Sequence, residues 1–159
     1  MKILVPLDGA PCSIAAIDAV VAQFRPGGTE VRLLHVVEWP QHLPMHLAMA
    51  EGPTGADDLL ESRNRAFREG HALISRAAGR LQAAGFETTS AVVPGSARDT
   101  IVDVASEWQP DLIVIGSHGW KGLDRLLLGS VSDAVVRRAP CSVEVVRAPH
   151  PVAARGAAA

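Results

Sequence analysis

The chain has 159 residues, 48% of them apolar and 20% charged, and a formal net charge of -2. These values are typical of one globular domain with its own core and exclude a disordered chain. The net negative charge and the lack of any run of basic residues argue against a nucleic-acid partner. The sequence also has no tyrosine beside its three Phe and three Trp, so it lacks the stacking platform of an RNA-binding sheet.

No targeting or membrane segment is expected. The apolar stretch at residues 1–5 is too short for a signal peptide, and no stretch approaches the length that crosses a bilayer. Cys12 and Cys141 are isolated and lack a C-x-x-C spacing, which is typical of a reducing compartment. We therefore expect a cytoplasmic protein with no membrane partner.

The N-terminal part of the chain is expected to form a buried strand and an amphipathic helix. Residues 2–7 contain the continuous Ile-Leu-Val run of a buried strand, and residues 8–11 interrupt it. Ser13 can cap the helix that follows, which residues 26–28 end. Helical spacing places these residues on its apolar face: Ile14, Ile17, Val20, Val21 and Phe24.

A second strand and a long helix are expected next. Residues 31–37 form the strand, and residues 38–57, rich in Pro and Gly without a regular period, are expected to form a mobile loop or a partial lid. Residues 58–84 have the clearest helical pattern, and Gly85 stands where a C-terminal cap belongs. The apolar stripe of this helix is predicted to contain Leu59, Ala66, Phe67, Gly70, Leu73, Ile74, Ala77, Leu81 and Ala84.

The second half of the chain repeats the alternation of strands and helices. Strands are predicted at residues 86–93, 111–115 and 141–147. A helix capped by Ser96 lies between the first two, and a short helix at 130–138 lies between the last two. The inward face of the first of these helices is predicted to contain Ile101, Val104, Ala105 and Trp108.

This order of elements predicts an α/β domain. Strands separated by helices favour a doubly wound, five-stranded and mostly parallel Rossmann-like sheet with helices on both faces. We expect one domain over residues 1–147 and a disordered tail over residues 148–159. In such sheets ligands bind beyond the carboxyl ends of the strands, and both Asp8 and Gly116 follow predicted strands.

The loop after the fourth predicted strand has the features of a phosphate site. Gly116 and Gly119 would let the backbone turn and approach a ligand closely. Gly129 and Ser130 open the next helix, whose first N–H groups have no intrahelical partner and favour an anion. The hydroxyls of Ser130 and Ser132 could donate to phosphate oxygens. A simpler interpretation, that the glycines only make turns and Ser130 only caps a helix, fits the loop taken alone.

With its strand and helix context, the loop resembles that of a known family. It reads GSHG, nine residues, then GS, which is the G-x-x-G-x9-G-[S/T] pattern of nucleotide-binding universal stress proteins. The resemblance continues through ILVPLDGA, LLHVVE, PDLIVIGSHG and GLDRLLLGSVSDAVVRRAPCSVEVV, and covers nearly the whole chain. It implies an ATP-binding protein, with Mg²⁺ as a possible companion, that acts as a nucleotide-dependent sensor or adaptor in the stress response.

The resemblance also implies roles for individual residues. Asp8 would accept hydrogen bonds from the ribose or help to place a metal–phosphate group, and the end of the second strand would lie against the adenine. The implied nucleotide-binding residues are Pro6, Leu7, Asp8, Val36, Val37, Gly116, His118, Gly119, Gly129, Ser130, Val131 and Ser132.

The family's typical subunit pairing implies a homodimer through the last strand, here Val143 to Val146. Two departures from the family pattern bear on these expectations. Trp120 and Lys121 follow the second glycine, where many members have Arg and a small residue. Glu144, beside Ser142 in the last strand, puts a carboxylate at the dimer edge, which brings the strength of the pairing into question.

Little or no turnover is expected. The sequence has no G-x-x-x-x-G-K-[S/T], no G-x-G-x-x-G after the first strand and no His-x-Gly-His, and no motif positions a general base. We therefore predict no catalytic residue. Two alternatives stay open: a slow ATPase or phosphotransferase that uses His118 as a general acid, and a module of the same fold that binds an unknown protein partner without nucleotide.

Trp39 and Trp120 could each stack on a base, or could equally shield a loop. His42 and His46, with Met45 and Met49 nearby, would suit a soft metal if they lay on a helix. Pro44 interrupts that helix and no third ligand is evident, so no metal site is predicted.

Overall fold

The computed structural model describes residues 1–38, 53–118 and 128–148, and for residues 53–56 it describes the backbone only. Strands and helices alternate along these segments. Their bounds are β1 (Lys2–Pro6), α1 (Pro11–Gln23), β2 (Glu30–Val37), α3 (Pro53–Ala83), β3 (Glu87–Pro94), α4 (Ala97–Trp108), β4 (Leu112–Gly116), α5 (Ser130–Arg138) and β5 (Ser142–Val146).

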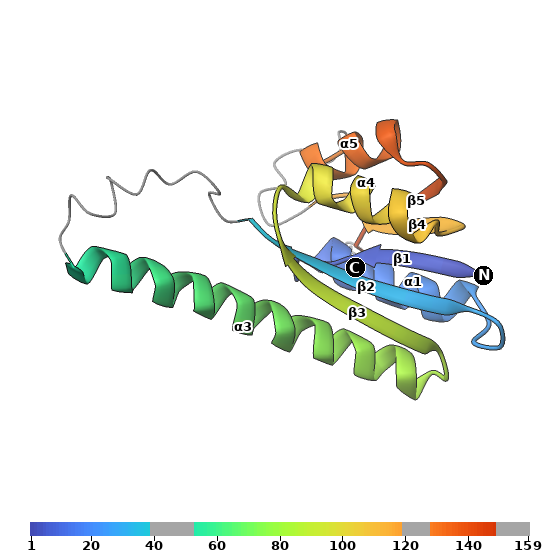
Figure 1. Cartoon of the computed structure of the whole chain (residues 1–159). Helices are drawn as coiled ribbons and strands as arrows, with labels where there is room; N and C mark the ends of the chain where they lie inside the picture. The colour runs from blue at the N-terminus through green and yellow to red at the C-terminus, as the bar shows by residue number, and fades with distance from the viewer. Residues whose placement is uncertain (39–52, 119–127, 149–159) are drawn as a thin grey trace, which may run out of the picture.

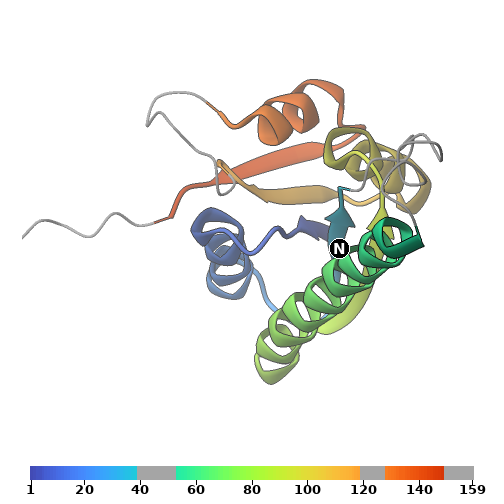
Figure 2. The ribbon, with the colours of Figure 1, turned by 90° about the vertical axis from the view of Figure 1, so that its left-hand side faces the viewer.

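The strands form one five-stranded parallel sheet with the order β3-β2-β1-β4-β5 (Figure 1). The chain first builds outward from β1 to β2 and β3, and then returns to place β4 and β5 on the other side of β1. Helices α1 and α3 cover one face, and α4 and α5 cover the other (Figure 2). The predicted doubly wound α/β sheet is confirmed.

The central strand β1 divides the core into two clusters. Ile3 and Val5 pack with α1 and α3, whereas Leu4 packs with α4 and α5, because successive side chains of a strand point to opposite faces. All three are 0% exposed. The continuous apolar run of β1 therefore follows from burial on both faces, as expected for a central parallel strand.

Helix α1 differs from its prediction in two respects: its N-terminal cap and one residue of its apolar face. It begins at Pro11, so Ser13 lies inside its first turn and does not cap it. The Ser13 hydroxyl is buried and donates to the Ala10 carbonyl at 3.0 Å. Proline favours the first helical position because its missing N–H would have no intrahelical partner there. At the other end, Val21 is 40% exposed and is not part of the core.

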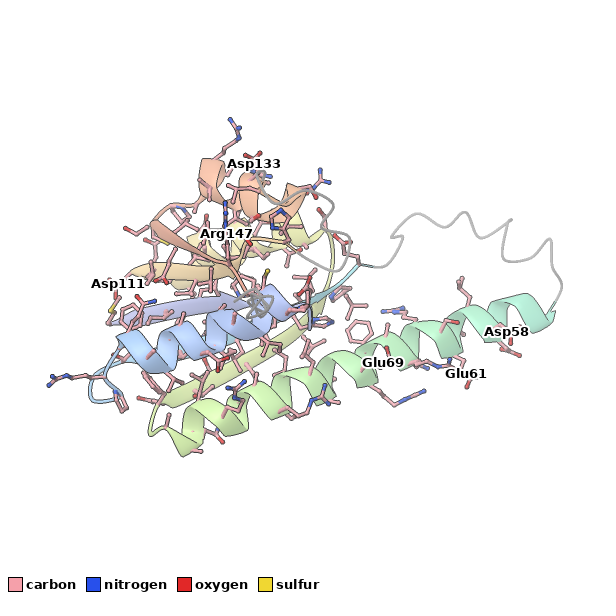
Figure 3. The ribbon with its side chains drawn as sticks, turned by 180° about the vertical axis from the view of Figure 1, so that it is seen from behind. Asp58, Glu61, Glu69, Asp111, Asp133 and Arg147 are labelled. Atoms are coloured by element: carbon pink, nitrogen blue, oxygen red, sulfur yellow. The ribbon has the colours of Figure 1, made fainter. Side chains whose placement is uncertain are left out.

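Helix α3 is longer than predicted. It begins at Pro53, so the expectation of a loop through residue 57 is wrong for its last part. Its N-terminal portion extends beyond the sheet, with Asp58 and Glu61 on that portion (Figures 1 and 3). The predicted cap is confirmed: Gly85 has φ +89° and donates its N–H to the carbonyl of Gln82 at 2.9 Å.

Several predictions lie outside the described residues. They concern the base-stacking Trp39 and Trp120, the tail at 149–159, and the loop residues Gly119 and Lys121. The histidine and methionine group weighed as a metal site lies outside them as well: His42, Met45, His46 and Met49. Within the described ranges, no helix combines the length and apolar character that a membrane span needs.

Candidate functional site

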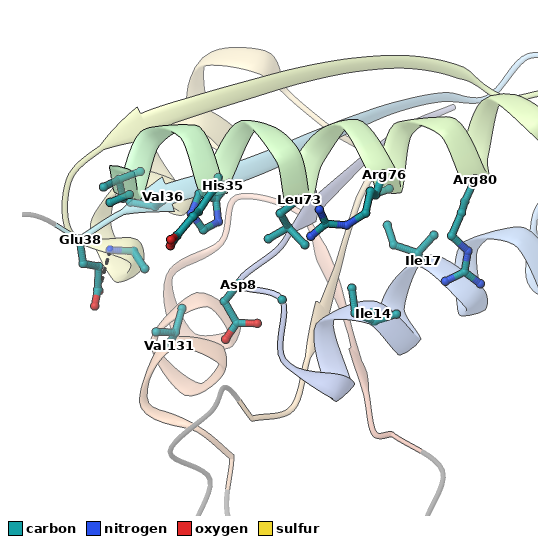
Figure 4. Close-up of a pocket in the computed structure, with 17 residues that line it drawn as sticks. Asp8, Ile14, Ile17, His35, Val36, Glu38, Leu73, Arg76, Arg80 and Val131 are labelled. Carbon is teal, nitrogen blue, oxygen red and sulfur yellow. Dashed lines mark hydrogen bonds between the residues drawn. The ribbon is translucent and has the colours of Figure 1, made fainter. Parts of the chain in front are cut away.

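A cavity of about 770 Å³ opens at the carboxyl ends of β1 and β2 (Figure 4). The chain reverses its direction of winding between β1 and β4, which is where doubly wound sheets bind ligands. The described residues that line the cavity are Asp8, Gly9, Ile14, Ile17, His35, Val36, Val37, Glu38, Ala66, Glu69, Gly70, Leu73, Arg76, Ala77, Arg80, Ala97 and Val131.

The turn after β1 brings Asp8 to this cavity. An oxygen of its carboxylate accepts the N–H of Ala10 at 2.9 Å, and Gly9 adopts φ +81° between them. Asp8 is therefore both a turn former and an exposed acidic group at the expected place. Its predicted neighbours Pro6 and Leu7 are buried and do not line the cavity.

The end of β2 supplies the apolar wall that was predicted for the adenine. Val36 and Val37 both line the cavity. The next residue, Glu38, accepts the backbone N–H of Ala97, at the first position of α4, at 3.2 Å. This contact holds the carboxyl end of β2 against the start of α4.

The two described ends of the glycine-rich loop are joined to each other. Gly129 donates its N–H to the carbonyl of Ser117 at 2.8 Å, and Ser117 donates its own N–H to Val146 at 2.7 Å. A Cβ on Gly129 would lie 3.1 Å from the Ser117 carbonyl oxygen. The glycine at position 129 thus permits the close approach that brings the start of α5 beside the end of β4.

Helix α5 presents its first N–H groups at this closure. Its first intrahelical bond runs from the N–H of Asp133 to the carbonyl of Gly129, at 2.9 Å, so the N–H groups of Ser130, Val131 and Ser132 precede it. Val131 lines the cavity and Ser130 is exposed. The positive end of this nine-residue helix is therefore available to an anion.

Ser132 has a different role from the one predicted. Its side chain is 2% exposed, and its hydroxyl lies 2.9 Å from the carbonyl oxygens of both Ser117 and Gly129. A hydroxyl has one hydrogen, and here that hydrogen serves the protein. The Ser132 hydroxyl therefore helps to close the loop in this structure.

Gly116 also has a different reason for its place. A Cβ there would lie 2.7 Å from the carbonyl carbon of Cys12 and 2.7 Å from the nitrogen of Ser13. The group that approaches Gly116 closely is therefore the first turn of α1. Glycine is needed at this position for helix packing, whereas the sequence analysis assigned it to ligand approach.

His118 points to its neighbour in this structure. Its Nδ1 lies 3.1 Å from the hydroxyl oxygen of Ser117, and it is not among the described residues that line the cavity. The general-acid role weighed for His118 therefore stays a prediction. The described part of the chain also brings no three His, Cys, Asp or Glu side chains together as a metal site.

Sequence reasoning missed the wall that α3 contributes. Gly70, Leu73 and Ala77 were assigned to a core stripe, and the same helical spacing carries that stripe along the cavity. Arg76 and Arg80 of the same helix also line the cavity, and Arg80 forms an ion pair with Asp18 of α1. The sequence signal was present, but it shows only which face turns inward and not what that face meets.

The fold and this cavity define a class: doubly wound α/β proteins with a cavity at the switch point of the sheet. The sequence model of the universal stress protein family matches residues 1–147. The chain therefore belongs to the universal stress protein family.

Curated relatives from a bacterium and an archaeon are also universal stress proteins. Universal stress protein YxiE of Bacillus subtilis is 31% identical and aligns over 92% of this chain and 98% of its own length. Universal stress protein MJ0531 of Methanocaldococcus jannaschii is 30% identical over 93% of this chain and 82% of its own length.

Solved structures share the fold. The protein MJ0577, whose structure was used to assign a biochemical function, superimposes with a TM-score of 0.77 at 28% identity, over 94% of this chain and 96% of that one. A universal stress protein in complex with cAMP has a TM-score of 0.63 at 23% identity, covering 94% of this chain and 98% of its own. An Arabidopsis thaliana family member with AMP bound has a TM-score of 0.64 at 18% identity, over 94% of this chain and 92% of its own.

The two cysteines lie in opposite environments although both are half-buried. Burial raises the pKa of the Cys12 thiol, but hydrogen bonds from the N–H of Ala148, the hydroxyl of Ser117 and the backbone of His118 more than offset it, so the pKa is lowered. Burial and the nearby carboxylate of Asp111 raise the pKa of Cys141. The sulfur of Cys12 thus faces hydrogen-bond donors beside the loop.

This difference predicts selective alkylation. At pH 8 Cys12 holds a larger thiolate fraction than Cys141 and should react faster with iodoacetamide, because the thiolate is the nucleophile. Peptide mass spectrometry after timed quenching gives the two rates. In denaturant the rates should converge, which controls for local sequence. A faster reaction at Cys141 in the folded protein would contradict the assigned environments.

Proposed function

We propose that this universal stress protein binds ATP at the cavity and acts as a nucleotide-dependent sensor or adaptor with little turnover. The observation that supports it best is the position of the first N–H groups of α5 beside the cavity, held there by the bond from Gly129 to Ser117. An anion is stabilised at such a helix terminus by the free donors and by the helix dipole.

The other walls suit the rest of an adenine nucleotide. Val36 and Val37 give an apolar surface for the base, and the carboxylate of Asp8 can accept the ribose hydroxyls. Asp8, Glu38 and Glu69 are the carboxylates among the described residues of the cavity, and Asp8 is the one proposed to share a Mg²⁺ ion with the phosphates, since Mg²⁺ prefers carboxylate and phosphate oxygens. Proteins of the same fold have been solved with cAMP and with AMP.

A cradle of this kind favours binding over hydrolysis. The phosphate donors in this proposal are backbone N–H groups, and the sequence has no motif that positions a general base for an attacking water. We therefore propose slow or no turnover. Repeated turnover that is lost in His118→Ala would instead favour an ATPase or phosphotransferase, and absence of nucleotide binding would favour a protein-interaction module.

The first test is calorimetric titration of nucleotide-stripped protein with ATP and Mg²⁺. Saturable binding near one ATP per subunit is expected. Gly129→Val should weaken it about tenfold or more, which corresponds to roughly 1.4 kcal/mol or more of binding free energy. The physical reason is that a side chain at position 129 would push α5 away from the Ser117 carbonyl.

Val136→Ala is the matched control, because Val136 lies on α5 and is 44% exposed. It should bind ATP as the wild type does. If the wild type gives no saturable binding by calorimetry or by a fluorescent nucleotide, the proposed ligand is wrong.

We also propose that β5 pairs with β5 of a second copy. The carbonyl of Val146 accepts the N–H of Ser117, the residue after β4, and backbone groups alternate sides along a strand, so those of Val143 and Val145 point outward. No described strand covers this edge. The carboxylate of Glu144 accepts a hydrogen bond from Gln23 of α1 at 2.7 Å, so it is held against the chain's own helix. The acidic residue is thus compatible with pairing.

Substitution of Val145 tests this pairing. Val145→Pro removes an outward N–H that the β4–β5 ladder does not use, and proline is tolerated on such an edge. We expect a dimer for the wild type and a folded monomer for Val145→Pro by analytical ultracentrifugation. Val145→Thr keeps the N–H and should remain dimeric. A monomeric wild type, or a dimer that survives Val145→Pro, would contradict pairing through β5.

A further inference from the structure

A histidine that the nucleotide assignment does not use joins β1, β2 and α3 at the cavity. His35 lies on β2, is half-buried and lines the cavity. Its Nδ1 is 2.7 Å from the carbonyl oxygen of Leu7, the residue that directly precedes Asp8. Figure 4 shows His35 on the cavity wall together with Asp8.

The partner determines which ring nitrogen carries hydrogen. A carbonyl oxygen can only accept, so Nδ1 of His35 must be the donor. Leu7 donates its own N–H to the carbonyl of Leu34 at 2.8 Å. Leu7 is therefore held to β2 at both of its backbone groups, once by the backbone of Leu34 and once by the His35 side chain. The imidazole extends the β1–β2 pairing by one residue, up to the position where Asp8 leaves the sheet.

The opposite edge of the ring is fitted to α3. A Cβ on Gly70 would lie 2.4 Å from Cδ2 of His35 and 3.0 Å from Nε2. Glycine is unfavourable inside a helix, so its presence at a buried helical position needs a cause. The cause here is the imidazole, which occupies the space that any side chain at position 70 would fill. Gly79 of the same helix differs, because a Cβ there would meet nothing within 4 Å.

The next turn of the chain completes the connection. Asp8 is fixed on its far side by the bond from the N–H of Ala10 to its carboxylate, at 2.9 Å. On the N-terminal side of Asp8, the direction of the chain depends on the Leu7 carbonyl, which His35 holds. A shift of α3 toward or away from the sheet would therefore reach Asp8 through one side chain.

We propose that His35 is a positioning residue for the nucleotide site and that it couples α3 to Asp8. This inference rests on the proposed function, since Asp8 is taken as the group that binds the ribose or the metal–phosphate unit. It adds a route by which nucleotide occupancy and the position of the long helix influence each other. Glycine at position 70 is the feature of α3 that makes this contact possible.

The test compares four variants with the wild type by calorimetric titration with ATP and Mg²⁺. His35→Phe keeps an aromatic ring but has no N–H, and it should weaken ATP binding about tenfold, because the Leu7 carbonyl loses the donor that fixes the chain leading into Asp8. His35→Asn places an amide N–H near the position of Nδ1 and should stay within about threefold of the wild type. Gly70→Ala should weaken binding by displacing the ring, whereas Gly79→Ala should not, although both add the same methyl group to α3.

A double substitution separates positioning from simple packing. If His35 acts through Asp8, the loss in His35→Phe should largely disappear in an Asp8→Asn background, because coupled residues are not additive. Additive losses would contradict the coupling, as would wild-type affinity in His35→Phe. If His35→Phe does not fold, the comparison of Gly70→Ala with Gly79→Ala decides. Absence of binding by the wild type contradicts the proposed function and this inference together, whereas normal binding by all four variants contradicts the inference alone.

Discussion

Burial of β1 on both faces is the constraint on which the rest of the structure depends. Ile3, Leu4 and Val5 are fully buried between two layers of helices, and β1 pairs with β2 at one edge and with β4 at the other. Because the chain fills one side first and the other later, the direction of winding reverses beside β1. The polar turn at Asp8 therefore follows β1 at the point where the winding reverses, and the cavity opens there. The position of the site thus follows from the burial of the strand.

The strands were predicted closely from sequence because their signal is physical and local. Continuous runs such as ILV in β1 and LIVI in β4 are needed only where both faces are covered. The helix ends were less predictable. Pro53 and Gly55 suggest a loop, yet both lie in the backbone of α3, and Ser13 looked like a cap although Pro11 starts α1. Which of several competing local signals prevails depends on the rest of the fold.

The candidate site was predicted in part. Asp8, Val36, Val37 and Val131 line the cavity as expected, because the ends of parallel strands and the following helix meet at one edge. Sequence spacing could not show that the Ser132 hydroxyl is used internally, since that depends on the carbonyl of Ser117, fifteen residues away in sequence.

The link between His35 and Gly70 could not be predicted either. It joins β2 to the middle of α3, and their contact depends on how that helix crosses the sheet. The one sequence signal was Gly70, a glycine inside a strongly helical segment. The sequence analysis counted it as part of the apolar stripe of α3. Glycine lowers the stability of a helix, so a glycine in a helix interior is a useful marker of a close contact with a neighbouring element. Here the contact leads back to the turn that carries Asp8.

The central claim is that the carboxyl edge of the sheet holds the nucleotide between Asp8 and the start of α5. Amide chemical shifts of ¹⁵N-labelled protein, followed during titration with ATP and Mg²⁺, test it most directly. The account predicts the largest shifts at Asp8, Ser130 and Val131. Little change is expected at Trp108 and Arg32, which do not line the cavity; Cζ of Arg32 lies 4.3 Å from the centroid of the Trp108 ring. Saturating shifts confined to other parts of the chain, with the amides of Ser130 and Val131 unmoved, would contradict the account.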